Sequence, residues 1–304
     1  MKSKKKIKTK FKIRRNRKKR LKKFKKFNKS KFNKYIFIIK IISIFLFFIL
    51  FELTITTTKN KISIIIPTYN RANLITRSIN SVINQTYNNI EILVIDDGST
   101  DNTKNEIDKI NDSRVRYIKL RKNKGGSFAR NIGIKKARGE YISFQDSDDI
   151  FHKDKLEKQI NNLIENKSDL DFCKICINLA TGYKYCHPGK EKEQKIINNG
   201  VFNELSSGNF LSSQSILVKK DSIKKFLFDD ELPRLQDYDL FLRMIPKLKV
   251  SYTREILAEL YRQNDSISYI SKKMEKAKEL ILKKNYDFDF FHQQKFIRYV
   301  KSFK

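Results

Sequence analysis

Two short apolar runs of the sequence end in clusters of aspartates. The aspartates are Asp96 and Asp97 after residues 90–95, and Asp146, Asp148 and Asp149 after residues 141–144. Carboxylates this crowded repel one another unless a cation offsets their charge. An Asp-x-Asp sequence on a tight turn directs two carboxylates the same way, which suits a hard divalent ion such as Mg²⁺ or Mn²⁺. Because these ions keep open positions for phosphate oxygens, the pattern predicts a diphosphate as ligand.

An aromatic ring follows another apolar run, where residues 62–66 lead into Pro67, Thr68, Tyr69, Asn70 and Arg71. The phosphate-binding loops of other nucleotide folds are missing: the sequence has no G-x-x-x-x-G-K-[ST] and no G-x-G-x-x-G after this run. The sequence therefore favours a nucleotide that is bound through a metal ion rather than by a glycine-rich loop.

Alternating strand and helix patterns predict the elements that must position these residues. Apolar runs predict buried strands at 61–66, 90–95, 115–120 and 141–144, and apolar positions at helical spacing predict helices at 72–86, 101–110, 127–137 and 153–165. This alternation is typical of an α/β fold with a mostly parallel sheet covered on both faces. Ligands of such sheets bind at the carboxyl ends of the strands, where the aspartates and Tyr69 lie.

The later part of the chain is less regular. We expect strands at 170–177 and 215–218, a helix at 236–244, one or two strands at 250–261, and peripheral helices in 270–304.

Five blocks of the sequence resemble family 2 glycosyltransferases of the GT-A fold. They are ISIIIPTYNR at 62–71, VIDDGSTD at 94–101, NKGGSFARN at 123–131, GEYISFQDSDD at 139–149 and LQDYDLFLR at 235–243. Their order and spacing match, so the resemblance predicts a GT-A (Rossmann-like) domain over residues 60–265 and a C-terminal helical extension over 266–304. It implies an inverting, metal-dependent enzyme of the hexosyltransferase type, which moves a sugar from a nucleotide-diphosphate sugar, usually a UDP-sugar, to an acceptor hydroxyl of a glycan, lipid or protein.

The resemblance also implies roles for residues of the nucleotide-sugar site. Pro67 and Tyr69 would line the base and ribose pocket, Tyr69 by stacking, and Asp97 would accept from the pyrimidine edge. Arg130 matches a basic residue near the diphosphate. Without the resemblance, Tyr69 could be a packing residue, Arg130 a surface charge, and residues 96–99 a turn followed by helix capping by Ser99 or Asp101.

The resemblance places the metal and the catalytic base on the remaining aspartates. Asp146 and Asp148 would bind Mn²⁺ or Mg²⁺, with Asp148 as the more direct ligand, and Asp237 would be the general base. An inverting displacement needs one base for the acceptor hydroxyl and neutralisation of the departing diphosphate. Asp237 could instead cap the helix at 236–244.

Two positions depart from the family pattern. The base is often preceded by Glu, whereas this chain has Gln236, also a familiar variant, which leaves Asp237 a slightly weaker base. The family often has a His after a late Tyr-Arg pair, but residues 261–266 read YRQNDS, with Asn264 or Asp265 as substitutes. These departures motivate an alternative: a non-catalytic sugar-nucleotide-binding or scaffold protein on the same fold.

The three cysteines have a structural and a metal-binding interpretation. Cys173, Cys176, Cys186 and His187 resemble parts of a zinc site. Cys173 and Cys176 fall in one expected strand, however, where they would point to opposite faces. Buried thiols or an incidental disulfide are therefore favoured over zinc.

The net charge of +33 is concentrated at the N-terminus. Residues 1–51 hold 21 of the 66 Lys and Arg and none of the 33 Asp and Glu, so the remaining 253 residues carry only +12. Residues 1–34 predict a polybasic disordered tail. Residues 35–51 are apolar except for Lys40 and Ser43, which predicts a transmembrane anchor near the short limit of length; a cleaved signal peptide and a buried helix are the alternatives.

The tail next to this segment predicts the orientation of the chain. The positive-inside rule places the tail in the cytoplasm and residues 52–304 on the lumenal or external side, although many members of the family work on the cytoplasmic face. Polybasic arms also bind nucleic acid, but beside an apolar segment a lipid-binding role is favoured. We therefore expect a single-pass membrane protein, with nucleic acid unlikely as a partner.

Overall fold

The computed structural model describes residues 39–40, 42–47, 60–262, 271–284 and 286–303. The chain divides into two units, residues 1–57 and residues 58–304. Most of the predicted anchor and all of the basic tail lie outside the described residues. Residues 39–40 and 42–47 are helical, and their apolar side chains are mostly exposed. No described helix has both the length and the apolar character that crossing a membrane requires.

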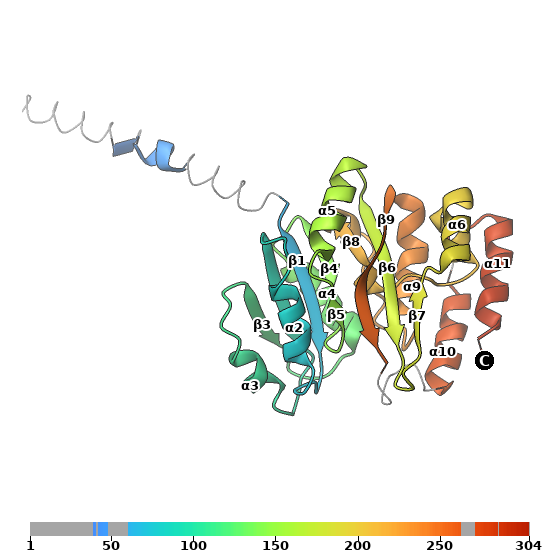
Figure 1. Cartoon of the computed structure of the whole chain (residues 1–304), viewed down its shortest axis with the longest axis horizontal. Coiled ribbons are helices and arrows are strands. Elements are labelled where there is room, and N and C mark those ends of the chain that lie inside the picture. Colours follow the sequence, from blue (N-terminus) through green and yellow to red (C-terminus); the bar gives the residue numbers. More distant parts are fainter. Residues whose placement is uncertain (1–38, 41, 48–59, 263–270, 285, 304) are drawn as a thin grey trace, which may run out of the picture. The chain divides into compact units, whose positions relative to one another are not determined.

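A nine-stranded sheet forms the centre of the second unit (Figure 1). Its strands are β1 (Ile62–Thr68), β2 (Ile90–Asp96), β3 (Val115–Lys119), β4 (Tyr141–Phe144), β5 (Ile150–Phe151), β6 (Leu170–Asn178), β7 (Lys184–His187), β8 (Ile216–Lys219) and β9 (Val250–Tyr261). The order is β3-β2-β1-β4-β8-β6-β9-β5, with β7 paired to β6. Strands β1 to β4 are parallel, whereas β8 runs antiparallel to β4 and β6.

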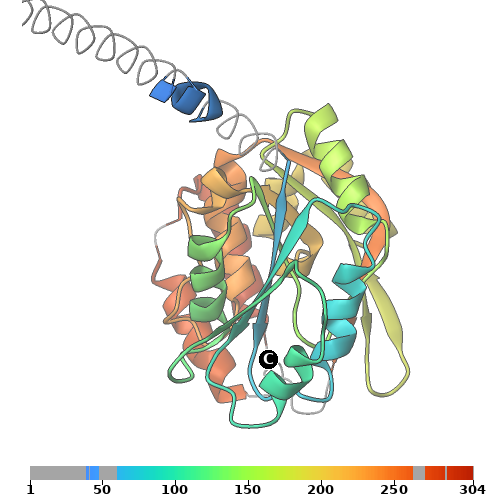
Figure 2. The ribbon, with the colours of Figure 1, turned by 90° about the vertical axis from the view of Figure 1, so that its left-hand side faces the viewer.

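Helices cover both faces of this sheet. They are α2 (Ile75–Ile83), α3 (Thr103–Asp108), α4 (Gly126–Lys136), α5 (Lys155–Glu165), α6 (Lys190–Asn199), α7 (Val201–Ser206), α8 (Lys220–Ile223), α9 (Gln236–Met244), α10 (Ser271–Leu282) and α11 (Phe290–Lys301). Figure 2 shows the sheet between α4, α9, α10 and α11 on one side and α2 and α5 on the other. The described residues also form the 3₁₀ turns η1 (Ser213–Ser215) and η2 (Ile245–Lys247).

Two hydrophobic cores follow from the alternation of side chains along the buried strands. In β1, Ile62, Ile64 and Ile66 face the core with α2 and α5, while Ile65 faces the core with α4 and α9. Strands covered on both faces are apolar almost throughout, as the sequence of β1 and β2 is. Gly133 of α4 lets the helix approach the sheet, because a Cβ there would lie 2.4 Å from the Cγ2 of Ile65.

The prediction of a parallel α/β fold is confirmed for the first half of the domain and is too simple for the second. The predicted strands and helices are present, and 250–261 is one strand. The sequence patterns missed β5, β7, α6, α7, α8 and both 3₁₀ turns, which are short or follow no clear periodicity. Helix α2 begins only at Ile75, because residues 72–74 form a turn in which the amide of Leu74 bonds to the carbonyl of Arg71.

Candidate active site

The loops after β1 and β2 are tied together at the carboxyl edge of the sheet. The backbone N–H of Asn70 donates to Ser99 Oγ at 2.9 Å, and Asn70 Oδ1 accepts from the N–H of Thr100 at 2.9 Å. Asn70 has a φ of 50°, a conformation that Asn tolerates better than most residues. Tyr69, directly before it, is 42% exposed, so its ring is not a core packing residue and is available at this edge.

Asp97 shapes the neighbouring loop at the start of α4. Its carboxylate accepts from the N–H of Lys124 at 2.9 and 3.1 Å and from the N–H of Gly125 at 2.7 Å. Burial raises the pKa of Asp97, and these hydrogen bonds offset only part of that effect. Asp97 therefore holds the 124–125 backbone in place. Its predicted contact with a pyrimidine stays a prediction.

Asp96 has the turn-forming role that the structural interpretation of this block predicted. Its carboxylate accepts from the N–H of Ser99 at 2.7 Å and from the hydroxyl of Tyr117. Asp101 likewise accepts from the N–H of Thr103 at 3.0 Å, but the N-cap residue of α3 is Asn102 and no side chain caps it, so the expected capping by Ser99 or Asp101 is absent. The aspartates of this block thus have different roles. Asp96 and Asp101 stabilise local turns, while Asp97 binds the backbone of residues 124–125 before α4.

A tight turn at Gly98 supports this arrangement. Gly98 has a φ of +81°, and a Cβ there would lie 3.0 Å from the backbone N of Asn123. We expect Gly98→Ala to lower the free energy of unfolding by roughly 1–3 kcal/mol and to weaken nucleotide binding, because the clash moves the loop that Asp97 holds. Thermal unfolding and UDP titration measure both effects.

Gly182→Ala is the matched control for Gly98→Ala. Gly182 has a φ of +82° but no atom within 4 Å of its would-be Cβ, so it incurs the backbone strain without the clash. Equal nucleotide affinities in the two variants would contradict the role given to the Gly98 turn.

The aspartates after β4 lie in a turn held by residues from several other elements. Arg130 Nη2 of α4 donates to Asp146 Oδ1 at 2.6 Å. Gln214 Nε2 of η1 donates to Asp146 Oδ2 at 2.5 Å and to Asp149 Oδ2 at 2.7 Å. The backbone N–H of Tyr261 in β9 donates to Asp149 Oδ1 at 2.8 Å.

Helix α2 holds the backbone of the same turn. Ser78 Oγ donates to the carbonyl of Asp146 at 2.8 Å, and Arg77 Nη2 donates to the carbonyl of Asp148 at 2.5 Å. The guanidinium of Arg77 also lies 4.4 Å from the ring centroid of Tyr261. The turn that carries the predicted metal ligands is thus fixed through backbone and side-chain contacts.

Charges in this turn are only partly compensated. Burial, with Asp146 and Asp148 nearby, raises the pKa of Asp149 well above its ordinary value. Burial alone lowers the pKa of Arg130, but the carboxylates of Asp146 and Asp237 outweigh it, so the pKa is raised and Arg130 stays charged. Arg130 is only 8% exposed, which excludes the interpretation of a surface charge.

Asp237 lies in the first turn of α9, next to the 213–215 turn. Its Oδ2 accepts from the backbone N–H of Ser213 at 2.9 Å. No side chain caps α9, whose N-cap residue is Leu235, so the predicted capping role of Asp237 is absent. Burial raises the pKa of Asp237, and the charge of Arg130 offsets part of that effect.

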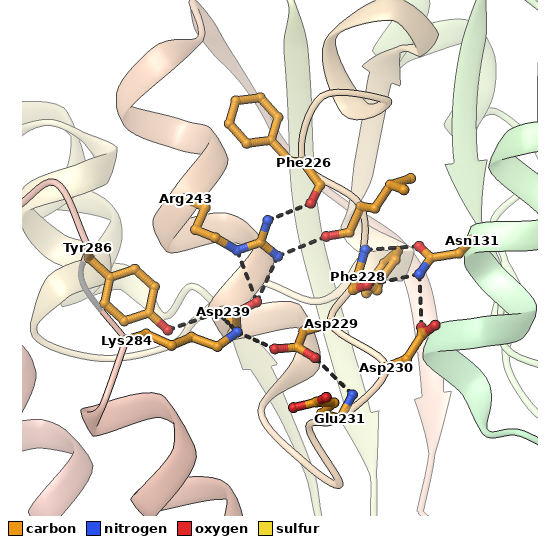
Figure 3. A network of polar contacts seen from close by, with 11 residues as sticks. Asn131, Phe226, Phe228, Asp229, Asp230, Glu231, Asp239, Arg243, Lys284 and Tyr286 are labelled. Atoms are coloured by element: carbon orange, nitrogen blue, oxygen red, sulfur yellow. Dashed lines mark hydrogen bonds and ion pairs between the residues drawn. The ribbon is translucent and has the colours of Figure 1, made fainter.

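Helix α9 is anchored by a second buried aspartate (Figure 3). Asp239 is fully buried; its Oδ2 accepts from Arg243 Nη2 at 2.7 Å, and its Oδ1 accepts from Lys284 Nζ at 2.7 Å and from the Tyr286 hydroxyl at 2.9 Å. Lys284 also lies 2.5 Å from Asp229. The C-terminal extension therefore helps to position the helix that carries Asp237.

The 226–231 segment links this network to α4 (Figure 3). Asn131 Nδ2 donates to the carbonyl of Phe228 at 2.8 Å and to Asp230 Oδ1 at 2.9 Å, and Asn131 Oδ1 accepts from the N–H of Phe228. The ring of Phe228 lies 5.5 Å from the guanidinium carbon of Arg130. Phe228 thereby supports the side chain that pairs with Asp146.

The sequence did not single out Ser213, Gln214 or Tyr261 as site residues. Ser213 and Tyr261 hold Asp237 and Asp149 through backbone N–H groups, and such contacts leave no mark in the residue type. Gln214 follows no motif, and only its place just before the predicted strand at 215–218 could have drawn attention to it. Asn264 and Asp265, the candidates to replace the missing His, lie outside the described residues.

The cysteines form a disulfide rather than a metal site. Cys176 of β6 and Cys186 of β7 face each other across the strand pair and are bonded, and Cys173 is a buried free thiol. In the described part of the chain, no three His, Cys, Asp or Glu side chains are grouped so that they could hold a metal by themselves. The expectation of buried thiols or an incidental disulfide thus agrees with the bonded pair Cys176–Cys186 and the buried Cys173.

Comparisons with known proteins agree on one family. The family described as Glycosyl transferase family 2 matches residues 63–225. A Haemophilus influenzae protein named as an uncharacterized glycosyltransferase is 34% identical over 222 residues, which cover 71% of this chain and 84% of that protein. An Escherichia coli protein, "UDP-Glc:alpha-D-GlcNAc-diphosphoundecaprenol beta-1,3-glucosyltransferase WfgD", is 39% identical over 140 residues, 45% of this chain and 55% of the relative.

Some relatives are considerably longer than the matched part. A Rickettsia typhi glycosyltransferase is 34% identical over 203 residues, but the match spans 62% of that protein. Among solved structures, S. aureus TarS 1-349 in complex with UDP-GlcNAc superposes with a TM-score of 0.64 at 23% identity, covering 79% of this chain and 71% of that one.

A second solved structure shares the fold at lower identity. Mannosyltransferase PcManGT from Pyrobaculum calidifontis, in complex with GDP-Man and Mn2+, has a TM-score of 0.54 at 14% identity and covers 79% of this chain and 68% of that one. The family match covers more than half of the sequence, and polar residues of the matching blocks gather at the carboxyl edge of the sheet. The chain therefore belongs to glycosyl transferase family 2, and it is a glycosyltransferase with the GT-A fold.

Proposed function

We propose that the protein transfers a sugar, with inversion, from a nucleotide-diphosphate sugar to an acceptor hydroxyl, with Asp237 as general base. One observation carries this proposal: the Asp146–Asp149 turn and Asp237 both contact the same short turn, through the consecutive residues Gln214 and Ser213. Two acidic groups are thus held beside each other at the carboxyl edge of the sheet. An inverting displacement needs a base near the attacking hydroxyl, and the other acidic group would hold the cation that neutralises the leaving diphosphate.

The residues of the Asp146–Asp149 turn fit a hard divalent ion such as Mn²⁺ or Mg²⁺. Asp146 and Asp148 offer oxygen ligands only, the donor type that these ions prefer, and the diphosphate and waters would supply the remaining ligands. Both oxygens of Asp146 accept hydrogen bonds, so Asp146 would bind an ion through its remaining lone pairs. We propose Asp148 as the more direct ligand. Such an ion would neutralise charge on the departing diphosphate.

The chain's own residues perform the other steps. Tyr69 is exposed at the edge of the sheet and would stack on the nucleotide base, beside Pro67 and the loop held by Asp97. Arg130 remains positively charged next to the diphosphate position. Asp237, fixed by the Ser213 amide, would take the proton of the acceptor hydroxyl as its oxygen attacks.

We favour a UDP-sugar as donor. The E. coli relative is named for transfer from UDP-Glc, and the TarS structures hold UDP-GlcNAc or UDP. A donor screen by nucleotide release, with UDP-, GDP- and CMP-sugars and with or without Mn²⁺, tests the proposal. Release from a UDP-sugar that depends on Mn²⁺ or Mg²⁺ is expected. UDP binding without release from any donor would instead favour the non-catalytic alternative.

We further propose that residues 35–51 anchor the protein in a membrane and that the catalytic domain lies on the lumenal or external side. The basic residues 1–34 support this orientation. The Cys176–Cys186 disulfide is an independent argument, because disulfides persist in oxidising compartments and are rare in the cytosol. The acceptor would then be a glycan, lipid or protein on that side.

Protease protection of sealed membranes tests the orientation, with an epitope tag at each end of the full chain. We expect the C-terminal tag to be protected and the N-terminal tag to be cleaved from the cytoplasmic side. The opposite pattern would place the catalytic domain in the cytoplasm.

A further inference from the structure

Gln214 lies at the centre of the carboxylate cluster, although no motif marks it. Its side chain is buried, and the residue is 3% exposed. Nε2 carries two hydrogens, and each goes to a different carboxylate: one to Asp146 Oδ2 at 2.5 Å and one to Asp149 Oδ2 at 2.7 Å. A single neutral amide therefore bridges two carboxylates that would otherwise repel each other.

The remaining contacts of these carboxylates make Gln214 the shared member of the cluster. Asp146 Oδ1 is taken by Arg130 and Asp149 Oδ1 by the N–H of Tyr261, so each of the four oxygens has a donor. Arg130 touches one of the two carboxylates, and Tyr261 the other. Gln214 touches both, so its amide couples the two carboxylates to each other.

The orientation of the Gln214 amide follows from its other end. Its Oε1 accepts from the hydroxyls of Ser212 and Ser213. Carboxylates only accept hydrogen bonds, so the nitrogen must face Asp146 and Asp149 and the oxygen must face the serines. A flipped amide would put an acceptor against two acceptors.

The neighbouring residue of the same turn holds the base. The N–H of Ser213 donates to Asp237 Oδ2 at 2.9 Å. The turn itself is rigid, because Ser215 Oγ donates to the carbonyl of Ser212 at 2.6 Å and Gln159 Nε2 of α5 donates to the carbonyl of Ser215 at 2.9 Å. Two consecutive residues thus connect the Asp146–Asp149 turn to Asp237.

We propose that Gln214 is a positioning residue of the transfer reaction: it fixes the Asp146–Asp149 turn relative to Asp237, so that the leaving diphosphate and the attacking hydroxyl are held in line. The proposal rests on the proposed function above. Misplacement of a reacting group by about 1 Å can cost roughly a hundredfold in rate. We therefore expect Gln214→Ala and Gln214→Glu to lower kcat by about tenfold to a hundredfold, with smaller changes in the KM of the donor.

Gln214→Glu is the sharper substitution, because it keeps the shape and replaces the donor with a third carboxylate. Combining Gln214→Glu with Asp149→Asn restores one contact. The amide introduced at position 149 can donate to the carboxylate introduced at position 214, while its oxygen still accepts from the N–H of Tyr261. We expect this double variant to recover part of the kcat lost in Gln214→Glu, because one of the two contacts is restored. Gln194→Glu on the exposed face of α6 is the matched control and should keep the wild-type kcat.

A measurement independent of activity completes the test on the full-length protein. Amide hydrogen exchange in segments 145–151 and 236–244 should be faster in Gln214→Ala than in the wild type or Gln194→Glu. Unchanged exchange in both segments, or a wild-type kcat in Gln214→Glu, would overturn the positioning role. Wild-type protein that releases no nucleotide from any donor would instead overturn the proposed function, while the exchange measurement still decides the place of Gln214.

Discussion

Asp237→Asn should stop sugar transfer while leaving UDP binding intact. Asn has the shape of Asp and can still accept from the Ser213 amide, so the fold at the start of α9 is preserved. What is lost is the group that takes the proton of the acceptor hydroxyl, and general-base catalysis contributes roughly 10²–10⁴-fold to rate. Nucleotide release with saturating donor and acceptor measures the loss, and UDP titration measures the binding.

Asp221→Asn is the control for this change, because Asp221 lies on α8 with a side chain that is 92% exposed. It should leave both rate and binding unchanged. Turnover at the wild-type rate in Asp237→Asn would show that Asp237 is not the base.

The pH dependence of the rate should also reflect the role of Asp237 as the base. Asp237 acts as a base only when it is ionised, and burial raises its pKa above the ordinary 3.8. The rate should therefore fall as the pH drops through a value above the usual Asp range. Because the charge of Arg130 lowers this pKa, Arg130→Gln should move the acid limb of kcat/KM to higher pH, whereas Asp221→Asn should not move it.

The second large effect is expected at the proposed metal ligand. Asp148→Ala should abolish the dependence of UDP binding on Mn²⁺ or Mg²⁺, because the carboxylate proposed to hold the ion is removed. Loss of about 3 kcal/mol of interaction corresponds to a rise of roughly a hundredfold in Kd. Calorimetric titration of UDP with and without Mn²⁺ measures the difference.

The backbone contacts of the turn should survive this substitution. The carbonyl of Asp148, which accepts from Arg77, is present in Ala as well. Asp221→Ala again serves as the control. Metal-dependent UDP binding of wild-type strength in Asp148→Ala would remove Asp148 from the proposed ion site.

Local sequence patterns are sufficient for the strands whose ends carry the predicted aspartates and Tyr69, but not for the 213–215 turn. The apolar runs of β1, β2 and β4 are buried on both faces, and the residues after them are polar, so the site had to lie at that edge of the sheet. The resemblance to family 2 glycosyltransferases, based on five short blocks, agrees with the family match over residues 63–225.

Contacts between segments that are distant in the sequence could not be predicted from local sequence patterns. The bridge from Gln214 to Asp146 spans 68 residues, and that from Lys284 to Asp239 spans 45. Neither residue type nor spacing indicates such a pair, because its geometry depends on how β8, α9 and the C-terminal helices pack. The antiparallel direction of β8 and the β6–β7 pairing with its disulfide likewise could not be predicted from local patterns.

The sequence by itself determined which residues are acidic, aromatic or buried, because burial and turn formation depend on short stretches of chain. It therefore predicted the parallel half of the sheet and placed Tyr69, Asp97, Asp146 and Asp148 at its carboxyl edge, while the resemblance to the family added Arg130 and Asp237 as site residues. Only the tertiary structure decided how these groups are held: Asp97 by the amides of 124–125, Asp237 by Ser213, and Asp146 by Arg130 and Gln214. The reason is that backbone donors and side chains from remote elements meet only once the sheet and its helices have packed.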